Sequence, residues 1–111
     1  MFVAESRQAA LRQARPYLET KYRAYHQWGQ AKAMPAGDND LGQDFDDLAD
    51  ARFLMGSADE VAAEIVDLSK ATGANYLSCP VQWPGMPQSQ VLEQMHRLAE
   101  EVMPKVRQGL A

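Results

Sequence analysis

Hydrophobic residues in the first thirty positions recur every three or four residues, which is typical of one amphipathic helix. The apolar stripe consists of Leu11, Ala14, Leu18, Tyr22 and Tyr25. Ser6 is the expected start, because a serine hydroxyl accepts hydrogen bonds from the free amides of the first helical turn. The helix is expected to run to about Trp28, before Gly29. Pro16 is expected to kink it, since proline lacks a backbone donor.

The hydrophobic pattern stops between residues 34 and 50, where the chain becomes polar and acidic. This stretch holds six aspartates, Asp38, Asp40, Asp44, Asp46, Asp47 and Asp50. A calcium loop is one interpretation, because oxygen ligands suit this cation. Counting back from Gly42, however, places Gly37 rather than an acid at the first ligand position of an EF-hand. We therefore expect a solvated acidic loop with at most one short helical turn.

The pattern from residue 51 onward predicts two units, each a strand followed by a helix. Residues 52–55 form a short apolar run suited to a buried strand, and residues 75–81 form a second one. Ser57 and Glu60 have the spacing of a capping box, which predicts a helix that ends near Gly73. A Pro-Gly turn at 84–85 leads into the last helix, from about residue 87 to 103, which Pro104 ends or kinks. The predicted stripes of these helices are Val61, Ile65 and Leu68, and then Val91, Met95, Leu98 and Val102.

Strands that alternate with helices of this length predict parallel βαβ units, and therefore a helix-rich α/β fold. The chain has 111 residues, the size of one domain. We expect three parts within it. Residues 1–30 form a helix after the remnant of a strand, residues 34–50 form the acidic loop, and residues 51–111 form the two βα units.

Composition and charge exclude several classes of protein. The formal net charge is −4 and no Lys/Arg cluster is present, so nucleic acid is not an expected partner. No apolar run reaches the ~20 residues of a membrane helix, so no membrane partner is expected. The single cysteine, Cys79, excludes an intramolecular disulfide and favours the cytoplasm. His26 and His96 lie on separate predicted helices without metal-ligand spacing, so no metal site is expected.

Four segments of the chain, taken in order, resemble the late part of one enzyme family. Residues 52–61 (Arg-Phe-Leu-Met-Gly-Ser-Ala-Asp-Glu-Val) resemble its signature of a short strand, Gly-Ser, an acidic pair and Val. Residues 14–18 (Ala-Arg-Pro-Tyr-Leu), 82–87 (Gln-Trp-Pro-Gly-Met-Pro) and 101–106 (Glu-Val-Met-Pro-Lys-Val) resemble further segments. The chain thus resembles the C-terminal third of a luciferase-like flavin-dependent monooxygenase.

This resemblance implies a partial (β/α)8 TIM barrel, made of its last two or three βα units. It implies a parent oxidoreductase that uses flavin mononucleotide (FMN) or, in some branches, a deazaflavin. A complete barrel needs ~250 residues, and most catalytic and flavin-binding elements of the family precede the matching part. We therefore expect a fragment without catalytic residues, which binds no flavin and is not competent alone. The alternative is a standalone, non-catalytic oligomerising or interaction module derived from that barrel.

The candidate cofactor-binding residues are Gly56, Ser57, Gln82 and Trp83, because barrel active sites form at the carboxyl ends of strands. Backbone amides at Gly56 and Ser57 can hold an anion, although a simple helix cap explains the same residues. Trp83 can flank a ring system while Gln82 adds a hydrogen bond. Packing of Trp83 under the Pro-Gly turn is an equally good interpretation.

The chain is also expected to form a homo-oligomer, most simply a dimer. Strands cut from a closed barrel leave unpaired backbone groups along both edges, and such edges pair with another chain. They also uncover barrel-facing side chains, such as Phe53 or Leu54 and Tyr76 or Leu77. Two-fold pairing is the commonest closed arrangement of identical chains.

Overall fold

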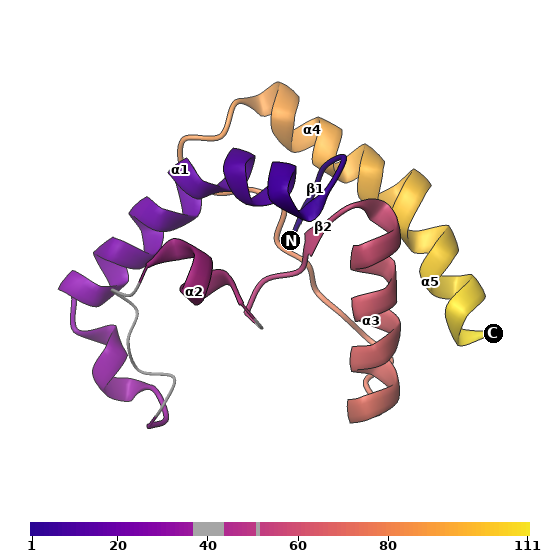
Figure 1. Cartoon of the computed structure of the whole chain (residues 1–111), viewed down its shortest axis with the longest axis horizontal. Helices are drawn as coiled ribbons and strands as arrows, with labels where there is room; N and C mark the ends of the chain where they lie inside the picture. Colours follow the sequence, from indigo (N-terminus) through magenta and orange to yellow (C-terminus); the bar gives the residue numbers. More distant parts are fainter. Residues whose placement is uncertain (37–43, 51) are drawn as a thin grey trace.

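The structure is a computed structural model that describes residues 1–36, 44–50 and 52–111. Its elements follow in the order β1 (Phe2–Val3), α1 (Arg7–Gln27), the 3₁₀ helix η1 (Gln30–Ala33), α2 (Phe45–Ala49), β2 (Met55–Gly56), α3 (Ala58–Thr72), α4 (Gln88–Arg97), the π-helical turn η2 (Leu98–Val102) and α5 (Met103–Leu110). Figure 1 shows an arch, with α1 on one side, α3 and α5 on the other, α4 across the top and the strands between them.

The predicted partial (β/α)8 barrel is wrong for this chain. Within the described residues the sheet has two strands of two residues each, β1 and β2, which pair in parallel with Phe2 opposite Met55 and Val3 opposite Gly56. Residues 75–81, the predicted second strand of the two βα units, form no strand. The chain is therefore a small helix-rich domain rather than a series of alternating strands and helices.

Side chains close the edges of this short sheet. On the outer side of β1, Val3 N donates to Gln94 Oε1 at 2.7 Å, and Gln94 Nε2 donates to Val3 O at 2.8 Å. On β2, Arg7 Nη1 donates to Met55 O at 3.1 Å. These bonds occupy backbone groups that a further strand would need. They give the physical reason why residues 75–81 do not extend the sheet, although the Met1 amine donates to Pro80 O at 3.1 Å.

Two hydrophobic clusters lie on the two faces of β1, because successive side chains of a strand point to opposite sides. Phe2 and Ala4 belong to the cluster that packs on α1 and α2. Met1 and Val3 belong to the cluster that packs on α3 and η2. The sheet is thus covered on both faces although it is only two strands wide.

The first predicted helix is confirmed as α1. Ser6 caps it by accepting a hydrogen bond from Ala9 N at 3.1 Å, and the helix continues through Pro16. Gly29 follows its end with a left-handed φ of 76°, a conformation that glycine adopts without strain.

The acidic stretch contains the expected short helical turn, which is α2. Asp44 caps it by accepting from Phe45 N at 2.9 Å, and Asp46 forms an ion pair with Arg15 at 2.6 Å. The residues on which the calcium interpretation depended, Gly37, Asp38, Asp40 and Gly42, lie outside the described residues.

The last helix is longer than predicted. Helical structure runs from Gln88 to Leu110 because the π-helical turn η2 joins α4 to α5. Pro104 lies at the start of α5, directly after the π-helical turn, in which Met103 N donates to Leu98 O five residues back. Val91 and Val102 of the predicted stripe are buried, but Met95 is 53% exposed, and the neighbouring Gln94 is buried instead. No helix among residues 1–36, 44–50 and 52–111 is long and apolar enough to cross a membrane.

Candidate interaction site

None of the four predicted cofactor-binding residues lines the groove that the described residues form between α3 and α5. Trp83 lies in the core, 4% exposed, and its ring stacks on Phe2 with centroids 6.4 Å apart. Gln82 is exposed one position before it. Gly56 and Ser57 lie at the junction of β2 and α3. The indole of Trp83 thus packs against the first strand, which agrees with the packing interpretation.

The junction at Gly56 and Ser57 is a complete capping box. Ser57 Oγ accepts from Glu60 N at 3.2 Å, and Ser57 N donates to Glu60 Oε2 at 2.8 Å. A Cβ atom on residue 56 would lie 2.6 Å from Glu60 Oε2, and the φ of 158° strains any side chain there, so both features favour glycine. The carboxylate of Glu60 therefore stands where an external anion would bind the start of α3.

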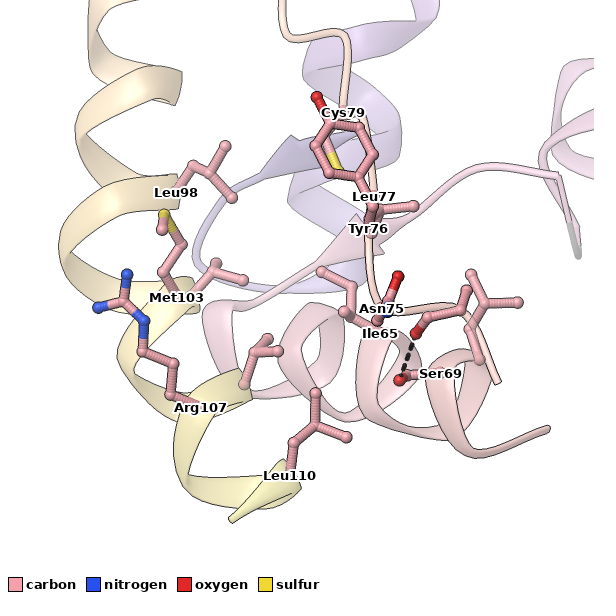
Figure 2. Close-up of a pocket in the computed structure, with 14 residues that line it drawn as sticks. Ile65, Ser69, Asn75, Tyr76, Leu77, Cys79, Leu98, Met103, Arg107 and Leu110 are labelled. Atoms are coloured by element: carbon pink, nitrogen blue, oxygen red, sulfur yellow. Dashed lines mark hydrogen bonds between the residues drawn. The ribbon is translucent and has the colours of Figure 1, made fainter. Parts of the chain in front are cut away.

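A groove of about 380 Å³ lies between α3, η2, α5 and residues 73–82, the first part of the segment that connects α3 to α4. We call residues 73–82 the open segment and the cavity the α3–α5 groove. Figure 2 shows Ile65 on α3, Leu98 and Met103 on the opposite wall, and Tyr76 and Leu77 along the open segment. α5 and α3 approach each other closely at Gly109. A Cβ on Gly109 would lie 2.8 Å from Val66 Cγ2.

Exposed hydrophobic side chains gather in this groove. Nine large hydrophobic residues are exposed in the described part of the chain, and five of them line the groove. The five are Leu68, Tyr76, Leu77, Met103 and Leu110. Tyr76 is the most exposed, at 85%. Clustered apolar exposure of this kind marks a binding surface more often than scattered single residues do.

The backbone of the open segment is unpaired along its middle. Among the residues that the structure describes, none forms a hydrogen bond with a backbone N–H or C=O of residues 75–79. Pairing resumes at Pro80 O, which accepts from the Met1 amine. Backbone groups of this kind form a template for a further strand.

Three contacts fix the beginning of the open segment. Gly73 caps α3 with a left-handed φ of 74° and donates from its backbone N to Ser69 O at 2.8 Å. Ser69 Oγ donates to Ala74 O at 2.8 Å, the dashed bond in Figure 2. Ala74 N donates to Thr72 Oγ1 at 3.2 Å. The chain therefore leaves α3 in a defined direction, toward the groove.

The groove has little chemistry suited to catalysis. Burial raises the pKa of the Cys79 thiol, and the positively charged N-terminal amine lowers it to a smaller extent. A thiol with a raised pKa is a poor nucleophile, because the thiolate is the reactive form. The charged side chain among the lining residues is Arg107 on α5. No cluster of three metal-ligating side chains is present in residues 1–36, 44–50 and 52–111.

Sequence reasoning missed the most buried polar side chain of the described residues, Gln94, at 2% exposure. Its position carries a weak signal, since it lies three residues after Val91 and four before Leu98 on the same helical face. A polar residue on an apolar stripe needs a buried hydrogen-bond partner. That partner, Val3, is 91 positions away.

Comparison with known proteins assigns no family to this arrangement. No family model matches the chain, and no solved structure gives a significant match.

Proposed function

We propose that this chain is a non-catalytic interaction module that binds an extended polypeptide strand along residues 75–79, with the side chains of that strand covering the α3–α5 groove. The observation that carries the proposal is the run of five residues without backbone partners among the described residues. An incoming strand supplies those partners by β-augmentation, and its side chains fill adjacent pockets.

The contrast with the sheet supports this assignment. The backbone of Val3 is bonded to Gln94, and Met55 O is bonded to Arg7. Capping of edges is a common way in which proteins prevent unwanted strand pairing. Within the part of the chain that the structure describes, the open segment lacks such caps between residues 75 and 79 and lies beside five of the nine exposed large hydrophobic side chains.

A synthetic peptide tests the proposal. The probe is a fluorescein-labelled peptide with the sequence of residues 73–82, in which serine replaces Cys79 to prevent oxidation. The chain is expected to raise its fluorescence anisotropy saturably and to protect the amides of residues 75–79 from hydrogen exchange. The control peptide carries the same side chains with alternate backbone amides N-methylated, which removes donors needed for pairing. Equal binding of both peptides, or of neither, contradicts the proposal.

The family resemblance remains as a second candidate function. We propose in this case that the chain derives from a luciferase-like flavin-dependent monooxygenase, with FMN or a deazaflavin as the cofactor of the parent. Its support is the order of the four segments and the capping box formed by Ser57 and Glu60. Titration of FMN against the chain distinguishes the two. The interaction module leaves FMN free, whereas saturable binding that Gln82→Ala abolishes favours the oxidoreductase.

We propose the cytoplasm as the location of the module. Its free thiol, Cys79, is compatible with a reducing compartment.

A further inference from the structure

We infer that the strand bound at the α3–α5 groove is the open segment of a second copy of this chain, so that residues 75–79 of two copies pair antiparallel and Tyr76 of each copy covers the groove of the other. This inference rests on the proposed function and names its partner. Four observations lead to it.

The first is that the same surface carries both a projecting side chain and a cavity. Tyr76 is 85% exposed and lies beside a groove of about 380 Å³. A two-fold interface can use this arrangement, because each copy presents the same patch and each contact occurs twice, so that the ring of one copy meets the cavity of the other. A surface with a cavity alone would need a different partner to fill it.

The second is the exposed apolar area. Tyr76 at 85%, Leu77 at 44%, Leu68 at 42%, Met103 at 38% and Leu110 at 46% are accessible. A tyrosine buries ~150–250 Å² when covered, and the five side chains together expose on the order of 500 Å². Two copies then cover about 1,000 Å², which is the lower bound for a specific interface. We therefore expect a weak dimer, because interfaces of this size belong to the weak and transient class.

The third is charge. The open segment, Gly-Ala-Asn-Tyr-Leu-Ser-Cys-Pro-Val-Gln, holds no charged side chain, although the whole chain has a formal net charge of −4. Two open segments therefore approach without repulsion between directly opposed like charges. An acidic chain of this kind repels its copies elsewhere on the surface, which favours contact at the neutral segment.

The fourth is the length of the unpaired run. Pro80 lacks a backbone N–H, and its carbonyl already accepts from the Met1 amine. Ala74 is bonded to Thr72 and Ser69. Pairing is thus confined to residues 75–79. When two such runs are antiparallel and centred on Leu77, each residue of one run faces a residue of the other.

Sedimentation equilibrium of the whole chain between about 1 and 200 µM tests the inference. We expect a concentration-dependent shift from the monomer mass of 12.4 kDa to twice that mass. Tyr76→Ser removes the projecting ring, and Ser78→Pro removes one pairing donor in the register in which Tyr76 and Ser78 form the hydrogen-bonded pairs. Each is expected to raise the dimer Kd at least ~10-fold, which is the loss of one good contact. Both positions are exposed, so circular dichroism should show an unchanged fold.

The matched control is Trp28→Ser, which removes an aromatic side chain that is 71% exposed and does not line the groove. It is expected to leave the dimer Kd unchanged. A folded monomer at all concentrations overturns the inference, and so does a dimer that Tyr76→Ser and Ser78→Pro leave intact. If the chain stays monomeric yet binds the peptide of residues 73–82, only the second-copy inference fails. If it neither dimerises nor binds the peptide, the proposed function fails as well.

Discussion

Replacement of Gln94 by methionine tests whether a single side chain completes the edge of β1. The amide of Gln94 forms two hydrogen bonds, with Val3 N at 2.7 Å and with Val3 O at 2.8 Å. Val3 is 1% exposed, so water cannot replace these bonds. Methionine has a similar length but supplies neither a comparable donor nor a comparable acceptor. The change therefore leaves one buried N–H and one buried C=O without partners.

An unsatisfied buried donor or acceptor costs ~1–3 kcal/mol. Two such groups set a range of about 2–6 kcal/mol, and the better burial of an apolar side chain offsets part of it. We expect Gln94→Met to lower the free energy of unfolding by about 2–4 kcal/mol. This is a large part of the ~5–15 kcal/mol that stabilises a typical domain.

Urea unfolding followed by the fluorescence of the buried Trp83 measures this loss. With an m-value of about 1–3 kcal/mol/M, the midpoint should fall by about 1 M or more. Gln88→Met is the matched control, because Gln88 is exposed on the same helix. It should change the free energy by less than ~0.5 kcal/mol. A Gln94→Met variant as stable as the control would refute the view that the amide stabilises the edge of β1.

Three further predictions concern residues singled out in the sequence. Trp83→Ala should lower the free energy of unfolding by ~3–5 kcal/mol in urea, because the ring is buried against Phe2; a variant of unchanged stability would favour a ligand-facing role. Gly56→Ala should cost about 1–3 kcal/mol, because the new Cβ meets Glu60 Oε2 at 2.6 Å. Made together with Glu60→Ala, the same substitution should lose the part of its penalty that comes from the Glu60 carboxylate and keep the part that comes from the backbone, because a φ of 158° at residue 56 strains any side chain; an equal penalty in both backgrounds would exclude a clash with that carboxylate. Burial raises the pKa of the Cys79 thiol above its ordinary value of 9.0. The stability that the neutral buried thiol contributes is therefore complete below that pH and is lost as the pH rises through the folded pKa. The difference in urea midpoint between the chain and Cys79→Ser should fall above pH 9, and a constant difference would contradict this reasoning.

Features that depend on neighbouring residues could be predicted from the sequence. The spacing of Ser57 and Glu60 predicted a capping box, and both of its hydrogen bonds are present. The stripe from Leu11 to Tyr25 and the cap at Ser6 predicted α1 nearly to the residue. In each case the determining contacts lie within one or two helical turns. Local propensity and local hydrogen bonds are therefore sufficient to define these elements.

The state of residues 75–81 depends instead on contacts that are distant in the sequence. Their apolar, β-prone composition predicts a strand, but a strand exists only when another edge accepts it. The nearest edge is that of β1, and Gln94 already binds the outward groups of Val3 from 91 positions away. Sequence pattern reports the propensity of a segment and not the availability of its partner. The segment whose composition predicts a third strand inside one copy thus remains available for pairing between two copies. The wrong fold prediction and the proposed dimer therefore share one physical origin.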